Sequence, residues 1–132
     1  MKCDDLTIDS AGHLAEQTEF DEAQLKESLT AVDPNPQAAL SLLLETYLED
    51  ASSLMVQVGE AAEQLDFDRL RFAAHTLKSS SALMGLMGLS KLCQQIEQHA
   101  RHQSADSLAM LVSQAKTVQT QSQQLLLSYQ LS

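Results

Sequence analysis

The chain is 132 residues long, a length that suits one domain with its own hydrophobic core. It has only five Val and two Ile, aromatic residues make up 4%, and Leu, Ala, Gln, Ser and Glu dominate, so we expect an all-α protein. The net charge of −10 argues against nucleic acid or an anionic membrane as the main partner.

The sequence shows no sign of export or of a membrane span. No run approaches the roughly 18 consecutive apolar residues that a transmembrane helix needs. The acidic start, with Asp4, Asp5 and Asp9, lacks the basic residues of a signal peptide. Cys3 and Cys93 fit neither a disulfide framework nor a zinc-ligand spacing. We therefore expect a soluble cytoplasmic monomer with reduced thiols, and we place Cys93 in the core.

The first part of the chain predicts a tail and a short helix. Residues 1–19 are polar and aperiodic, so we interpret them as a flexible tail before a single domain at 20–132. From Phe20 to Val32 apolar residues recur at helical spacing, and the run 33–36, with Pro34 and Pro36, then breaks the chain. We expect one short helix followed by a turn.

Four longer amphipathic segments follow, at about residues 36–64, 66–84, 87–102 and 104–131. Asn35 before Pro36, Asp66 and Ser104 are suitable N-cap residues. Gly85 suits the left-handed position that ends a helix. Short connections between long amphipathic helices favour antiparallel packing, so we predict an up-down four-helix bundle preceded by a short additional N-terminal helix.

His75 is the candidate functional residue of the segment at 66–84. With about 100° per residue and Leu77 at the middle of the buried stripe, His75 falls about 160° away, which places it in water. The same calculation places five neighbours on this outer face, at helical spacing from His75: Asp68, Arg71, Lys78, Ser79 and Ala82.

This arrangement suits a covalent phosphoryl carrier. A neutral imidazole is a nucleophile near pH 7, and nearby cations disfavour its protonated form. Lys78 and Arg71 could balance a phosphohistidine, and Ser79 could offer a hydroxyl or leave room for a partner. The sequence has no nucleotide-binding loop and no carboxylate cluster beside the histidine, so the metal and catalytic groups should come from a partner. Spacing alone does not overturn the alternative that His75 is merely one solvated polar residue on a helix.

The run from His75 to Gly85, HTLKSSSALMG, continues through Leu89, Cys93 and the pair Ile96-Glu97. This pattern resembles the signature of histidine-containing phosphotransfer (HPt) domains of multistep two-component phosphorelays. The resemblance covers about residues 20–130 and is strongest between residues 73 and 97.

The resemblance implies a role for individual residues. His75 would be the phospho-acceptor, Lys78 the phosphate-stabilising lysine, and Gly85 the end of the histidine-bearing helix. Glu97 falls where the family often has Gln or Glu near the imidazole, so it could orient His75 by a hydrogen bond. Ser79 departs from the glycine that many members have after the lysine, for which we expect altered affinity but retained function.

The resemblance also implies partners. These would be receiver domains of a hybrid sensor kinase or a response regulator, whose phospho-aspartate and bound Mg²⁺ exchange the phosphoryl group with the histidine. The chain itself would need no cofactor or metal and would have no kinase activity. Phe72 and Leu83 lie at the edges of the exposed face, where they could form an apolar docking rim around His75, although neighbouring helices could equally cover them.

Two other classes of function remain as alternatives. An acidic helical adaptor or secretion chaperone would bind a protein segment without chemistry, and it would keep working without His75. A metal-dependent helical enzyme could use Glu97, His99 and His102, although two histidines at a helix end are also explained by solvation and by the helix dipole.

Overall fold

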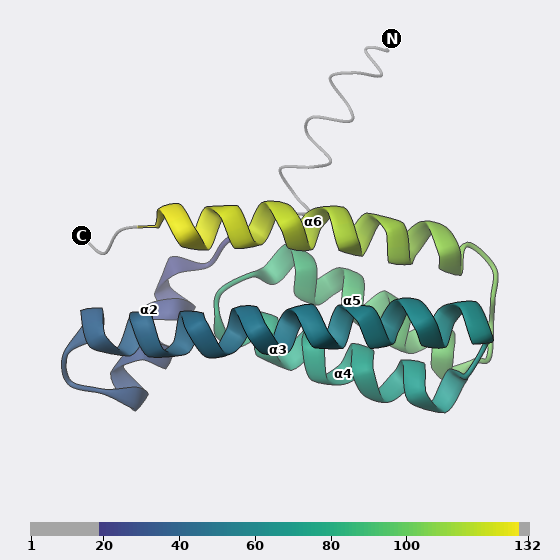
Figure 1. The fold of residues 1–132 in the computed structure, drawn as a ribbon, viewed down its shortest axis with the longest axis horizontal. Coiled ribbons are helices and arrows are strands. Elements are labelled where there is room, and N and C mark those ends of the chain that lie inside the picture. Colours follow the sequence, from purple (N-terminus) through teal and green to yellow (C-terminus); the bar gives the residue numbers. More distant parts are fainter. Residues whose placement is uncertain (1–18, 130–132) are drawn as a thin grey trace, which may run out of the picture.

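The computed structural model describes residues 19–129, and within this range the chain forms five α-helices. They are α2 (Glu22–Val32), α3 (Pro36–Gln64), α4 (Phe67–Leu83), α5 (Met87–Arg101) and α6 (Leu108–Ser128). Figure 1 shows α3, α4, α5 and α6 running along the long axis in alternating directions, with α2 at one end beside the start of α3. The predicted all-α, up-down four-helix bundle with a short additional N-terminal helix is confirmed.

Two of the predicted helix starts are confirmed by their capping bonds. The Asn35 side chain accepts from the backbone amides of Gln37 and residue 38 at 3.0 and 3.4 Å, and Pro36 occupies the first helical position of α3. The Asp66 side chain accepts from the amide of Arg69 at 3.2 Å. Each cap satisfies backbone donors that have no partner inside the helix.

The predicted start of the last helix at Ser104 is wrong, because α6 begins at Leu108. The Ser104 hydroxyl accepts from the amide of Asp106 in a local turn, and Ser107 stands before the helix in a left-handed conformation, with φ 60°. A serine that bonds to a nearby backbone amide offers the chain an alternative to helix. At the other end α6 stops at Ser128, and the predicted residues 130–131 lie outside the described range.

The segment before α2 is paired with the α4–α5 turn, which explains why α2 begins two residues later than predicted. Phe20 forms an isolated antiparallel bridge with Leu86. Glu19 is the one residue of the predicted tail that lies within the described range, and its carbonyl accepts from the amides of Met87 and Gly88 at 3.0 and 3.3 Å. Cys3 and His13 lie outside the described residues.

The α4–α5 turn depends on Gly85. Its φ of 79° lies in the left-handed region, its amide donates to Ala82, and the amide of Leu86 donates to Ser81, the pair of bonds of a Schellman motif. A Cβ on Gly85 would lie 2.4 Å from the carbonyl oxygen of Asp21. The turn therefore requires glycine for its backbone conformation and for the close approach of the N-terminal segment.

The core lies along the axis of the bundle and is built mainly from Leu, Ala, Val and Met side chains. Cys93 is buried among them, as predicted. No helix between residues 19 and 129 is long and apolar enough to cross a membrane. The largest fully buried apolar side chains come from every helix and from the α4–α5 turn: Leu25, Leu29, Val58, Leu70, Leu77, Leu86, Leu89, Ile96, Val118 and Leu126.

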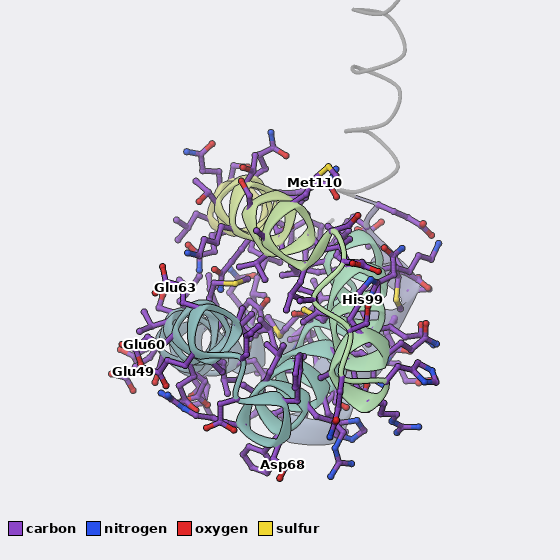
Figure 2. All side chains as sticks on the ribbon, turned by 90° about the vertical axis from the view of Figure 1, so that its right-hand side faces the viewer. Glu49, Glu60, Glu63, Asp68, His99 and Met110 are labelled. Atoms are coloured by element: carbon purple, nitrogen blue, oxygen red, sulfur yellow. The ribbon has the colours of Figure 1, made fainter. Side chains whose placement is uncertain are left out.

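The outer side of α3 is acidic. Figure 2, which looks along the bundle, shows Glu49, Glu60 and Glu63 pointing away from the core on this side. Glu60 pairs with Arg69 of α4 at 2.8 Å, where both side chains are substantially exposed. These carboxylates give the folded molecule an acidic face on the side of α3.

Candidate functional site

His75 projects into solvent from the middle of α4. Its side chain is 57% exposed, whereas Ala74 and Leu77 on the same helix are completely buried. The buried stripe of α4 faces α3 and α5, so the residue about half a turn away from it points outward. The position predicted for His75 from helical periodicity is confirmed.

A buried carboxylate from α5 holds the imidazole. The side chain of Glu97 is only 4% exposed, and its Oε2 lies 3.0 Å from Nδ1 of His75. Its Oε1 accepts from Nζ of Lys78 at 2.8 Å, and Oε2 also accepts from a guanidinium nitrogen of Arg101 at 3.2 Å. One carboxylate thus binds three nitrogen donors from two neighbouring helices.

The charge of Glu97 determines which nitrogen of the ring is free. Burial would raise the pKa of the Glu97 carboxyl, but hydrogen bonds and charge from Lys78 and His75 outweigh it and lower the pKa below its ordinary value of 4.5. Glu97 is therefore ionised at neutral pH and can only accept hydrogen bonds. In the neutral imidazole Nδ1 of His75 must then carry the proton, which leaves the lone pair on Nε2, and Nε2 has no hydrogen-bond partner among the described residues.

The other residues predicted for the exposed face of α4 differ in how far they are exposed to solvent. Asp68, Arg71 and Ser79 are exposed. Lys78 and Ala82 are half-buried rather than fully in water, and Lys78 is 27% exposed because its ammonium group reaches back to Glu97. The structure therefore joins His75, Lys78 and Glu97 directly, while no ion pair links Arg71 to another residue in 19–129.

Arg101 is a member of the site that the sequence reasoning missed. It lies four residues after Glu97 on α5, the spacing at which side chains of a helix meet. The signal was present, but Arg101 could be recognised only once Glu97 was known to point at His75. With Arg101 and Lys78 the site holds two cations beside the imidazole.

Phe72 and Leu83 are not covered by neighbouring helices. These residues are 68% and 57% exposed, which excludes the alternative that neighbouring helices cover them. Beside Leu83 lies an open groove of about 360 Å³ between α2, α3 and α4, lined by residues that include Val32, Leu43 and Met84. The histidine-bearing helix therefore carries exposed apolar side chains before and after the imidazole.

The histidines at the end of α5 do not form a metal site with Glu97. Nδ1 of His99 donates to the carbonyl of Gln95 on its own helix at 2.9 Å, and His102 is exposed. No group of three or more His, Cys, Asp or Glu in residues 19–129 is arranged to hold a metal ion. Glu97 is instead bound to His75, Lys78 and Arg101.

Comparison with known proteins identifies the class. Residues 42–127 match the model of the Hpt domain family, and the chain belongs to this family. The chain is 32% identical over 68 residues to multistep phosphorelay regulator 1 of Schizosaccharomyces pombe, an alignment that covers 52% of this chain and 23% of that protein. The aligned part is thus less than a quarter of the yeast regulator.

A solved structure shows the same fold. The crystal structure of histidine-containing phosphotransfer protein B (HptB) from Pseudomonas aeruginosa PAO1 matches with a TM-score of 0.68, covering 85% of this chain and 97% of that one. The two sequences are 22% identical, so this likeness bears on the fold alone. It agrees with the helical bundle described above.

Proposed function

We propose that this protein is a histidine phosphotransfer protein of two-component signal transduction, which accepts a phosphoryl group on Nε2 of His75 and relays it between receiver domains. The observation that carries the proposal is the exposed imidazole, whose Nδ1 is held by the buried Glu97 and whose Nε2 has no hydrogen-bond partner among the described residues. Family membership supports the same function and gives no support to an adaptor without chemistry.

The transfer step follows from this geometry. The Nε2 lone pair attacks the phosphorus of a receiver phospho-aspartate, the P–N bond forms, and the aspartate leaves as a carboxylate. Lys78 and Arg101 can then turn from Glu97 toward the new anion, because charge-assisted hydrogen bonds to phosphate are strong. Arg71, four residues before His75 on the exposed face, and the hydroxyl of Ser79 are further candidates for phosphate contacts.

The remaining requirements of phosphoryl transfer belong to the partner. In-line positioning and a metal that neutralises the phosphate are the main sources of catalysis in this reaction. We propose that a receiver domain supplies both, with its own Mg²⁺, so that this protein acts as a carrier without kinase activity. The half-buried Ala82, one turn past Lys78, would leave room for the approaching receiver.

The partners are proposed to be receiver domains of a hybrid sensor kinase, a response regulator, or both. Phe72 and Leu83 would form the apolar part of the docking surface on either side of His75. We propose that the carrier works as a monomer in the cytoplasm, where it can dissociate from one receiver and bind the next.

Intact-mass measurement tests the proposal directly. Wild type, His75→Gln and the matched control His102→Gln are each incubated with a phosphorylated receiver domain and Mg²⁺. We expect one added phosphoryl group, labile in acid and stable in base, on wild type and on His102→Gln but not on His75→Gln. Absence of the group from wild type with several receivers would favour the adaptor alternative.

A further inference from the structure

One anion, Glu97, lies beside two cations and the imidazole at this site. The Glu97 carboxylate accepts from His75, Lys78 and Arg101 at 3.0, 2.8 and 3.2 Å. A glutamine of nearly the same size could accept the hydrogen bond from the ring, but it would carry no charge. The negative charge is therefore a separate property of this residue, distinct from its ability to orient the imidazole.

This charge matters most once His75 has been phosphorylated. A ring with a phosphoryl group on Nε2 and a proton on Nδ1 is formally cationic, and the Glu97 oxygen faces that proton. An opposite charge at hydrogen-bond distance favours the charged form of a titratable group. A ring that keeps the proton leaves phosphorus as neutral imidazole, whereas a ring without it would leave as imidazolate, a much poorer leaving group.

Building on the proposed phosphotransfer function, we infer that Glu97 is a positioning residue whose negative charge keeps the Nδ1 proton on phosphorylated His75 and thereby speeds delivery of the phosphoryl group. In the delivery step a carboxylate oxygen of the receiver aspartate forms a bond to phosphorus. The bond between phosphorus and Nε2 breaks, and its electron pair returns to Nε2. The Nδ1 proton stays in place, so no proton has to be transferred.

Lys78 and Arg101 modulate this effect. Before phosphorylation both cations share the carboxylate and weaken its field at the ring. A phosphoryl group offers them a second anion, and their movement toward it would leave Glu97 to act more fully on the Nδ1 proton. The charge on Glu97 is therefore expected to act most strongly in the phosphorylated state, when delivery occurs.

Other titratable groups near the ring are few. On the exposed face of α4, Arg71 and Asp68 lie one and two turns before His75 and carry opposite charges. Burial raises the pKa of the Cys93 thiol on α5 to about 12, so it stays neutral. Charged groups on the helices that pack against α4 include three that have partners of their own: Glu60 of α3 pairs with Arg69, Lys26 of α2 pairs with Glu22, and Lys91 of α5 pairs with Glu19.

NMR titration of the phosphorylated ring tests the inference. Wild type, Glu97→Gln and Arg101→Gln are phosphorylated with phosphoramidate, a small-molecule phosphoryl donor, and the ¹⁵N shifts of the His75 ring are followed against pH. We expect the pH midpoint for loss of the Nδ1 proton to be about one pH unit lower in Glu97→Gln than in wild type. Arg101→Gln should move it upward, because a cation near the ring is removed. Phosphoryl transfer from Glu97→Gln to a receiver should begin to slow at a correspondingly lower pH.

Glu60→Gln is the matched control, since Glu60 of α3 is also a carboxylate paired with an arginine, Arg69, and not with His75, and its midpoint should equal that of wild type. Equal midpoints in wild type and Glu97→Gln, or shifts of both site variants in the same direction, would overturn the inference and leave the carrier function standing. If Glu97→Gln takes up no phosphoryl group, the inference is tested on Arg101→Gln alone. A midpoint in Arg101→Gln that equals that of wild type, or lies below it, would then reject the inference. Failure of wild type itself to be phosphorylated on His75 would instead contradict the proposed function.

Discussion

The hydroxyl groups of Tyr47 on α3 and Ser81 on α4 lie 2.9 Å apart inside the bundle. Both residues are buried, and burial raises the pKa of the Tyr47 hydroxyl to about 12 although the hydrogen bond to Ser81 acts in the opposite direction. A polar pair in an apolar core stabilises the fold only while both partners are present. This bond therefore joins the histidine-bearing helix to α3 in a defined register.

Removal of one partner of this pair should destabilise the protein. Tyr47→Phe leaves the Ser81 hydroxyl without its side-chain partner, at an expected cost of about 1–3 kcal/mol in the free energy of unfolding. The double variant Tyr47→Phe/Ser81→Ala removes both polar groups and should cost less than the sum of the two single changes. Urea unfolding of all four proteins measures this coupling, and strict additivity would contradict it.

Gly85→Ala should be among the more damaging single changes outside the core. The left-handed backbone costs a residue with a Cβ about 1–2 kcal/mol, and the new Cβ would in addition lie 2.4 Å from the Asp21 oxygen. We expect a loss of at least about 2 kcal/mol in urea unfolding. Gly59→Ala is the control, because its Cβ would meet only the flexible end of Lys116 at 3.1 Å and alanine favours helix. A similar loss in both variants would show that the turn is not the cause.

Lys78 and Arg71 should differ in importance. Lys78 is bound to Glu97 beside the imidazole, whereas Arg71 is exposed without an ion pair in the described part of the chain. Lys78→Ala should slow phosphoryl transfer about tenfold or more, consistent with loss of one charge-assisted contact of about 1.5–3 kcal/mol. Arg71→Ala should have a smaller effect. Rapid-quench kinetics with one receiver domain measures both, and equal rates would remove the distinction.

The contribution of Glu97 to stability should disappear in acid. Because its pKa is lower in the folded protein than the ordinary 4.5, ionised Glu97 stabilises the fold at pH values above 4.5. That stabilisation is lost as the pH falls through the lower, folded pKa. The difference in unfolding free energy between wild type and Glu97→Gln should therefore be largest near pH 7 and shrink below pH 4.5. A difference that stays constant down to pH 3 would contradict this assignment.

The exposed apolar side chains should contribute to partner binding without contributing to folding. Phe72→Ser and Leu83→Ser should each weaken binding to a receiver domain about fivefold or more, the effect of a contact worth about 1 kcal/mol. Met110→Ser on α6 is the control, because Met110 is 59% exposed and Figure 2 shows it pointing outward from that helix, away from the labelled Asp68 of α4. Calorimetric titration gives the three affinities, and equal values would exclude the docking role.

Helical periodicity predicted most of the fold and the face on which His75 lies. The spacing of apolar residues defines which side of α4 is buried, and residues on the opposite side, such as His75, are therefore exposed to water. The start of α6 could not be obtained in this way, because Ser104 is an equally good residue for a cap and for a local turn. The choice depends on how the chain crosses from α5 to α6.

The contacts within the site needed the tertiary structure. Glu97 was expected near His75 from the family resemblance, but periodicity does not show that it is buried or that Lys78 turns inward to meet it. Arg101 became recognisable only through Glu97, which lies one turn before it. Side chains that act through a shared partner on another helix leave little trace in a single sequence.

The pairing of residues 19–21 with the α4–α5 turn has a consequence for the order of folding. Asp21 donates to the carbonyl of Gly85 at 2.7 Å, across 64 residues of sequence. Such a contact closes a long loop, which costs conformational entropy. The contact offsets that cost only when α4, α5 and the turn between them have already formed a hairpin. We therefore expect the hairpin of α4 and α5 to form early and the pairing of residues 19–21 to form late. The same pairing should open first under native conditions, so the Asp21 amide should exchange its hydrogen faster than the amides within α4.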